Sequence, residues 1–191
     1  MRFSADLTDI RFGIGPMSKN VVDASIAFVN SRKQPLMLIP SRRQVEWGGG
    51  YTGWTTHDFV PYVRERTDQI LLMRDHGGPG QGDNPKDDMH SLFVDCAYFD
   101  AIHLDPWKIA TNFEEGAAIV PIMLEHCHGL NPDLLYEIGT EQAICPYEAN
   151  ELAAFITFLE RNTTSAQFKQ IRWVVIQSGT SLHGNENTGH H

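Results

Sequence analysis

Short apolar runs, separated by amphipathic segments, organise the chain from end to end. Six such runs end in polar or glycine-rich residues, and they lie at residues 10–14, 35–39, 70–73, 101–105, 134–141 and 173–180. Several of them are rich in β-branched or aromatic residues. Short apolar runs of this kind are typical of strands in a buried parallel sheet.

Segments with helical periodicity lie between the runs. Residues 21–30 place Val22, Ile26 and Val29 on one face, and Ser18 stands in the N-cap position before them. Three further helices are predicted: one that begins after a cap at Thr55 or Thr56, one at 113–124 and one at 146–161. Their apolar stripes are best explained as surfaces that face a core.

The alternation of strand and helix predicts an α/β fold. A closed barrel and an open doubly wound sheet both fit the pattern. The first run is not followed by a GxGxxG motif, which weakens a dinucleotide-binding interpretation, and the chain contains no P-loop motif. A (β/α)8 barrel requires eight strands, whereas six runs are visible here.

Length and composition narrow the class of protein. The chain has 191 residues and a formal net charge of −9, which argues against a nucleic-acid partner but not against a phosphorylated small molecule. No run approaches the roughly 20 apolar residues of a membrane span. The three cysteines form no CxxC pair, so we expect a cytoplasmic protein without a disulfide framework.

Ionisable side chains occur at the end of each of the last four apolar runs. The carboxyl ends of neighbouring parallel strands meet at one mouth of a barrel, which is where barrel enzymes carry their chemistry. Side chains two positions apart share a face of a strand. The candidates are Arg74, Asp75 and His76, then His103 and Asp105, then Glu137 and Glu141, and finally His183 and Asn185.

This mixture of histidines and carboxylates suits a divalent metal. His76, Glu141 and His183 supply the donors that Zn²⁺ prefers, and Asp75 is placed to act as a general acid or base. The alternative is that these residues only cap strand ends and satisfy loop backbone. Recurrence after four successive runs favours a site. For His103 two roles fit equally: a binding residue, or a buried histidine that is hydrogen-bonded to a neighbour.

A glycine-rich segment with aromatic residues, at 41–55, follows the second run. Its glycines allow the backbone to approach a ligand closely. Arg42 and Arg43 are suited to phosphate, and Gln44 is the expected ligand contact. The alternative is a loop that its own aromatic side chains pack.

Four motifs in order carry a family resemblance. They are Ser-Arg-Arg-Gln-Val-Glu-Trp-Gly-Gly-Gly-Tyr-Thr-Gly-Trp-Thr at 41–55, Arg-Asp-His-Gly-Gly-Pro at 74–79, Ile-His-Leu-Asp at 102–105 and Tyr-Glu-Ile-Gly-Thr-Glu at 136–141. Together they resemble the accessory (Z-type) subunits of class II D-tagatose-1,6-bisphosphate aldolase, which are related to class II fructose-bisphosphate aldolases. The resemblance covers roughly residues 8–180.

The resemblance implies a fold and two residue roles. It implies a (β/α)8 TIM barrel, here truncated after about six β/α units, so that residues 1–191 form a single partial barrel domain. Asp75 would be the acid/base group and His76 a metal ligand, with His183 matching a second ligand. The chain departs from the family where Arg74 replaces a glycine, at Pro106-Trp107, and at 142–147.

We therefore expect metal-assisted retro-aldol cleavage of a ketose phosphate, with Zn²⁺ as the expected metal. The alternatives are a non-catalytic subunit that stabilises a class II aldolase, and a hexulose-6-phosphate C4 epimerase. A partner aldolase subunit or a homo-oligomer is compatible with each. The expected residues are Asp75 for catalysis, His76, Glu141 and His183 for metal, and Gln44, Arg42, His103, Asp105 and Asn185 for substrate.

Overall fold

A single parallel sheet forms the frame of the chain. The structure is a computed structural model, and it describes residues 3–83, 89–139, 148–176, 181–183 and 186–188. Six strands pair in chain order, and every neighbouring pair is parallel. Each predicted run overlaps one of them: β1 (Gly13–Ile14), β2 (Leu36–Leu38), β5 (Ile70–Gly77), β6 (Ala101–Leu104), β7 (Leu135–Gly139) and β8 (Ile171–Val175).

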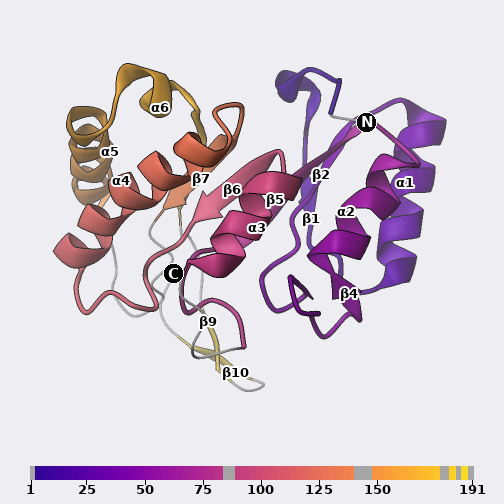
Figure 1. Cartoon of the computed structure of the whole chain (residues 1–191), viewed down its shortest axis with the longest axis horizontal. Helices are drawn as coiled ribbons and strands as arrows, with labels where there is room; N and C mark the ends of the chain where they lie inside the picture. The colour runs from indigo at the N-terminus through magenta and orange to yellow at the C-terminus, as the bar shows by residue number, and fades with distance from the viewer. Residues whose placement is uncertain (1–2, 84–88, 140–147, 177–180, 184–185, 189–191) are drawn as a thin grey trace.

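Helices connect the successive strands (Figure 1). They are α1 (Lys19–Arg32), α2 (Thr56–Arg64), α3 (His90–Tyr98), α4 (Phe113–Leu130), α5 (Ala149–Asn162) and α6 (Ser165–Lys169), preceded by the 3₁₀ helix η1 (Leu7–Asp9). Two small sheets stand apart, one from β3 (Val45–Glu46) and β4 (Trp54–Thr55), the other from β9 (Ser181–His183) and β10 (Glu186–Thr188). No helix within the described ranges is long and apolar enough to cross a membrane.

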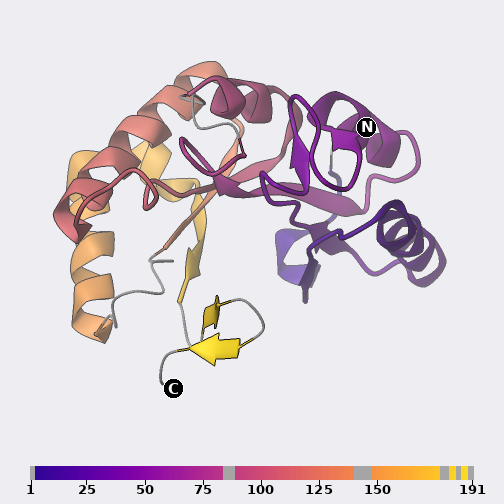
Figure 2. The same ribbon diagram turned by 90° about the horizontal axis from the view of Figure 1, so that it is seen from below.

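The main sheet curls into an open half-barrel. Figure 2 shows the strands along the inside of an arc whose outer side carries the helices. Among the described residues, β1 and β8 are the two edges of the sheet and do not pair with each other. The α/β class and the barrel-like parallel sheet are therefore confirmed, whereas the complete eight-stranded barrel stays a prediction.

The ends of the helices follow local capping rules. Thr55 caps α2, since its side chain accepts a hydrogen bond from the backbone N–H of Asp58. Ser18 occupies the N-cap position of α1 but makes no side-chain capping bond. Helix α4 continues to Leu130, beyond the predicted end at 124, although it contains Pro121, and it ends directly before the Asn131-Pro132 pair.

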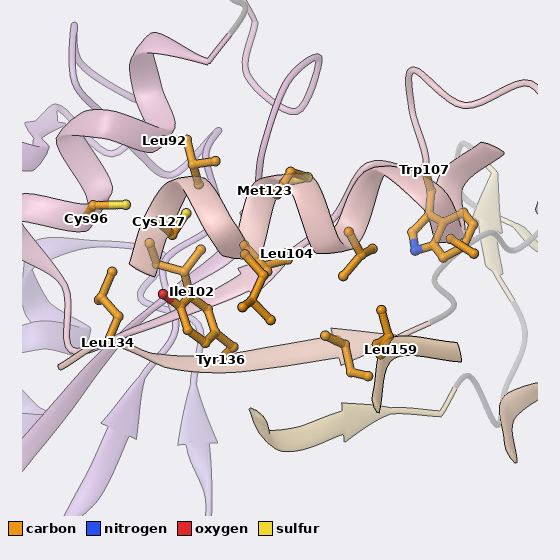
Figure 3. Packing of buried hydrophobic residues seen from close by; sticks show 14 of the residues in the cluster. Leu92, Cys96, Ile102, Leu104, Trp107, Met123, Cys127, Leu134, Tyr136 and Leu159 are labelled. Carbon is orange, nitrogen blue, oxygen red and sulfur yellow. The ribbon is translucent and has the colours of Figure 1, made fainter. Parts of the chain in front are cut away.

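The helix-facing side of the sheet carries two apolar clusters. The first cluster joins α1 and α2 to β2 and β5, through residues such as Val29, Phe59 and Leu36. The second cluster joins α3, α4 and α5 to β6 and β7. Figure 3 shows labelled members of this second cluster gathered around helix α4 and the adjacent strands: Leu92, Cys96, Ile102, Leu104, Trp107, Met123, Cys127, Leu134, Tyr136 and Leu159.

The inner side of the sheet changes character along its strands. Leu71, Met73 and Ala101 form a smaller buried apolar cluster on this side. The next inward positions toward the carboxyl ends, which follow from the two-residue period of a strand, are Asp75 and His103. The inner side therefore turns polar at the carboxyl edge of β5 and β6.

Candidate functional site

Two histidines and two aspartates come together at the carboxyl edge of β5 and β6. His76 Nδ1 lies 2.6 Å from Asp105 Oδ2. His103 Nδ1 lies 3.6 Å from Asp75 Oδ1, and His76 Nε2 lies 3.9 Å from Asp75 Oδ2. The structure thus brings together polar residues from two of the four strand ends that were predicted to converge.

An irregular backbone allows Asp75 and His76 to share one side of the strand. Adjacent residues of a regular strand point to opposite faces. Here His76 has φ of 51°, in the left-handed region, and the pairing of β5 with β6 shifts register between Arg74 and Gly77. Both side chains consequently line the same cavity.

Two glycines permit the close approach of β5 to β6 at this point. A Cβ atom on Gly77 would lie 2.8 Å from the carbonyl oxygen of His103, and one on Gly78 would lie 2.9 Å from that of Asp105. Gly78 also has φ of 142°, a conformation that side chains rarely adopt. The glycines after Asp-His are thus needed to hold the two strand ends together.

Asp105 fixes the orientation of His76. Its carboxylate is buried, and its Oδ1 accepts a hydrogen bond from the backbone N–H of Trp107 at 3.1 Å. The backbone N–H of Asp105 in turn donates to the carbonyl of Gly77 at 2.9 Å. With Nδ1 of His76 bound to this carboxylate, Nε2 is left on the side of Asp75. A carboxylate in this position is the usual support of a metal-binding histidine.

The two histidines favour the ionised form of Asp75. Burial of its carboxyl group acts to raise the pKa, but the neighbouring imidazoles of His103 and His76 together outweigh burial, so the pKa of Asp75 lies below its ordinary value. Asp75 is therefore a carboxylate at neutral pH. In that form it accepts a proton or binds a cation.

A cavity of about 310 Å³ opens beside this cluster. The segment after β2 forms much of its wall, and an isolated parallel bridge joins Ser41 to Asp75. Arg74, which is fully buried, donates to the carbonyls of Pro40 and Ser41 and so holds this segment against β5. The cavity is lined by Gly15, Ile39, Ser41, Arg42, Arg43, Gln44, Asp75, His76, Gln81 and Lys108.

Two residues predicted to bind substrate, Gln44 and Arg42, do line the cavity but are also bonded within the protein. Gln44 accepts a hydrogen bond from the backbone N–H of Ser41 at 2.9 Å. The guanidinium of Arg42 is bound by Glu46 at 2.6 Å and by the carbonyl of Gly78 at 2.9 Å. Their positions fit contact with a ligand, whereas the role itself stays a prediction.

The remaining predicted residues are not placed. Glu141 and Asn185 lie outside the described residues. His183 is the last residue of β9, and its side chain also lies outside the described part of the structure. Their roles as metal ligands or substrate contacts therefore stay predictions.

Two cavity residues, Lys108 and Gln81, had not been predicted. Lys108 follows the Ile-His-Leu-Asp motif by three positions, so it belongs to the segment directly after a strand end, where such residues are expected. Gln81 is buried and its Nε2 donates to the carbonyl of Asp105 at 3.2 Å. The sequence carries no comparable signal for Gln81.

The donor set of the cluster fits a divalent metal. One ligand atom from each of Asp75, His76 and His103 can be chosen so that all lie within 4.8 Å of one another. Tetrahedral Zn²⁺ with bonds of about 2.0–2.1 Å places its ligand atoms about 3.3 Å apart. The separations of 3.6 and 3.9 Å that join Asp75 to the two histidines are larger, and the three atoms together are bounded by 4.8 Å, so the side chains must draw closer to hold an ion.

Comparison with known proteins places the fold but not a family. No protein-family model matches the chain. Its structure is similar to that of a probable tagatose 6 phosphate kinase from Sinorhizobium meliloti 1021, with a TM-score of 0.71 and 22% identity over 93% of this chain and 51% of that one. It is also similar to the YdjI aldolase from Escherichia coli K12, with a TM-score of 0.51 and 15% identity over 79% of this chain and 53% of that one. The chain thus spans about half the length of each, and at these identities the likeness shows a shared fold.

Proposed function

We propose that the chain carries the acid–base and metal-binding centre of a class II aldolase-like protein that acts on a ketose phosphate. The observation that carries the proposal is the arrangement of Asp75 beside His76 at the carboxyl edge of a barrel-like sheet, with Asp105 fixing the imidazole. The fold shared with a named aldolase and with a probable sugar-phosphate kinase supports the substrate class.

Asp75 is proposed as the group that moves the proton in retro-aldol cleavage. Its carboxylate accepts the proton of the hydroxyl on the carbon that becomes the aldehyde. The neighbouring carbon–carbon bond breaks, and its electron pair passes toward the ketose carbonyl. A lowered pKa keeps Asp75 ionised and ready for this step at neutral pH.

His76 and His103 are proposed to hold a divalent cation, with Glu141 and His183 as further predicted ligands. Such a cation, when bound, polarises the carbonyl of a ketose and stabilises developing negative charge. Asp105 keeps His76 oriented, and Arg74 keeps the wall at Ser41 against β5. The reacting group is thereby confined between fixed side chains.

The test is the substitution Asp75→Asn. We expect triose release from ketose bisphosphates to fall by a factor of about 10²–10⁴, the usual contribution of a general acid–base group. We expect the metal content, measured by elemental analysis, to stay unchanged, because the proposal assigns the cation to the histidines and only the proton transfer to Asp75. Asp9→Asn, at an exposed site on η1, is the matched control and should retain the activity. Full turnover in Asp75→Asn contradicts the proposal.

Two alternative functions are compatible with the same site: a C4 epimerase and a non-catalytic subunit. A C4 epimerase requires the same aspartate and metal but releases no triose, so analysis of the products from hexulose 6-phosphates separates it from an aldolase. A non-catalytic stabilising subunit is the role that the resemblance to the accessory (Z-type) subunits implies. It predicts no metal, no turnover alone, and a stable complex with a co-expressed aldolase.

A further inference from the structure

Two cationic side chains from different loops line the cavity beside Asp75 and His76. Arg43 belongs to the segment between β2 and β3, and Lys108 belongs to the turn after β6. Both are exposed, so their charged groups are accessible from solvent. The cavity's other cation, Arg42, differs from them because it is buried and bound to Glu46.

Lys108 lies within the electrostatic field of other cations. Partial burial and the charges of Arg43 and Arg42 lower its pKa, while Asp105 and Asp83 act in the opposite direction. A protonated lysine in this position is repelled by its cationic neighbours. An anion bound between Arg43 and Lys108 would relieve that repulsion and interact favourably with both groups.

Asp83 competes for the same arginine. Its Oδ1 lies 3.5 Å from Nε of Arg43, and the two side chains are 78% and 61% exposed. Exposed ion pairs of this kind contribute little stability, so an incoming anion can displace the carboxylate at small cost.

We propose that Arg43 and Lys108 form a subsite for the phosphate group of the sugar, in the cavity that Asp75 and His76 also line. Arginine offers paired donors to phosphate oxygens, and lysine adds a point charge. A cavity of about 310 Å³ is large enough for a small phosphorylated sugar. The identity of the sugar rests on the proposed function, whereas the anion subsite does not.

The test measures binding of inorganic phosphate by calorimetry, at low ionic strength. EDTA is present to remove any bound metal, so that binding of phosphate to a metal ion cannot account for the signal. We expect Arg43→Met and Lys108→Met each to weaken binding about tenfold or more, the effect of losing one charge-assisted hydrogen bond. Asp83→Asn is expected to tighten binding, because it removes the competing carboxylate. Arg32→Met, in the exposed last turn of α1, is the matched control and should bind as the unmodified chain does.

Two further ligands separate a sugar phosphate from free phosphate. A ketose 6-phosphate should bind more tightly than inorganic phosphate, and Lys108→Met should weaken it. The affinity for the same ketose without phosphate should not change in Lys108→Met. The proposal is overturned if the unmodified chain binds no phosphate, or if either methionine variant binds phosphate as well as the control does.

The result of the phosphate-binding test does not depend on whether Asp75 is catalytic. Asp75→Asn should retain phosphate binding at Arg43 and Lys108. Turnover that survives in Asp75→Asn contradicts the catalytic proposal and leaves the phosphate subsite standing. Phosphate affinity that is unchanged in Arg43→Met and Lys108→Met contradicts the subsite but does not affect the proposed role of Asp75.

Discussion

His76 holds a backbone conformation that costs a non-glycine residue on the order of 1–3 kcal/mol. The hydrogen bond to Asp105 and the close contact of Gly77 and Gly78 with β6 keep it there. Strain that the surrounding structure enforces is common at functional sites. At His76 its effect is to place an imidazole beside a carboxylate that adjoins it in sequence.

Asp75 makes the stability of the fold depend on pH. Its pKa is lowered in the folded chain and has its ordinary value of 3.8 when unfolded. The unfolded chain therefore takes up the proton first as pH falls, so the stabilisation is present above about pH 4 and is lost as pH falls through the folded pKa.

The expected result is a difference in free energy of unfolding between the unmodified chain and Asp75→Asn that shrinks below about pH 4. Urea denaturation in EDTA, at pH 7 and at several lower values, measures this difference. A difference that stays constant over that range contradicts the assignment of the lowered pKa to Asp75.

The sequence was enough to predict candidate residues of the site, but not which groups each of them contacts. The sequence identifies Asp75, His76 and His103 as candidates because they end apolar runs. It does not show the left-handed φ of His76, since the two-residue period of a strand would separate these neighbours. The glycine pair that follows is the nearest sequence signal. Nor does it show that the guanidinium of Arg42 is bound by Glu46.

At the scale of elements, capping separates two helices that begin with a similar residue. The side chain of Thr55 accepts from the backbone N–H of Asp58 and donates to its Oδ2 at 2.6 Å. Ser18 stands in the same position of α1 without such a bond.

Thr55→Ala should lower the free energy of unfolding by about 1 kcal/mol, the usual loss for a side-chain cap. Ser18→Ala is the matched control, and we expect a clearly smaller loss because no capping bond is removed. Urea denaturation of both variants measures the difference. Equal losses would contradict the cap at Thr55.

The strands were predictable and some helices were not. Each predicted apolar run overlaps a strand because all six strands lie in a sheet that is covered on its helix-facing side. Helix α3 was not predicted: its N-cap position is Met89, which makes no side-chain capping bond, so the usual start signal is missing. Helix α6 has five residues, too few for a periodic pattern to emerge.

At the scale of the whole molecule, the two helix-side clusters divide the chain between β5 and β6. Asp75 and His76 come from β5, on the side of the first cluster, and His103 and Asp105 come from β6 and its end, on the side of the second. The alternation of strands and helices was predictable from the sequence, whereas the pattern left the strand order open between a closed barrel and a doubly wound sheet. The curvature of the sheet was not predictable, because it depends on strand register, which an apolar run does not specify.

This division predicts that the two halves respond separately to loss of packing. Leu36→Ala in the first cluster and Leu159→Ala in the second each remove a fully buried side chain, at an expected cost of roughly 2–5 kcal/mol. Hydrogen exchange should rise most in α1, α2 and β2 for Leu36→Ala, and most in α4 and α5 for Leu159→Ala. A uniform rise along the chain in both variants would mean one cooperative core.

The irregular pairing between Arg74 and Gly77 also has a consequence for how long the site stays assembled. Regular ladder pairing is interrupted at this end of the contact between β5 and β6, so we expect brief separations of the two strands to begin there. A ligand that contacts residues from both strands opposes these separations in proportion to its concentration. The lifetime of the assembled site is therefore set by its occupant as well as by the fold.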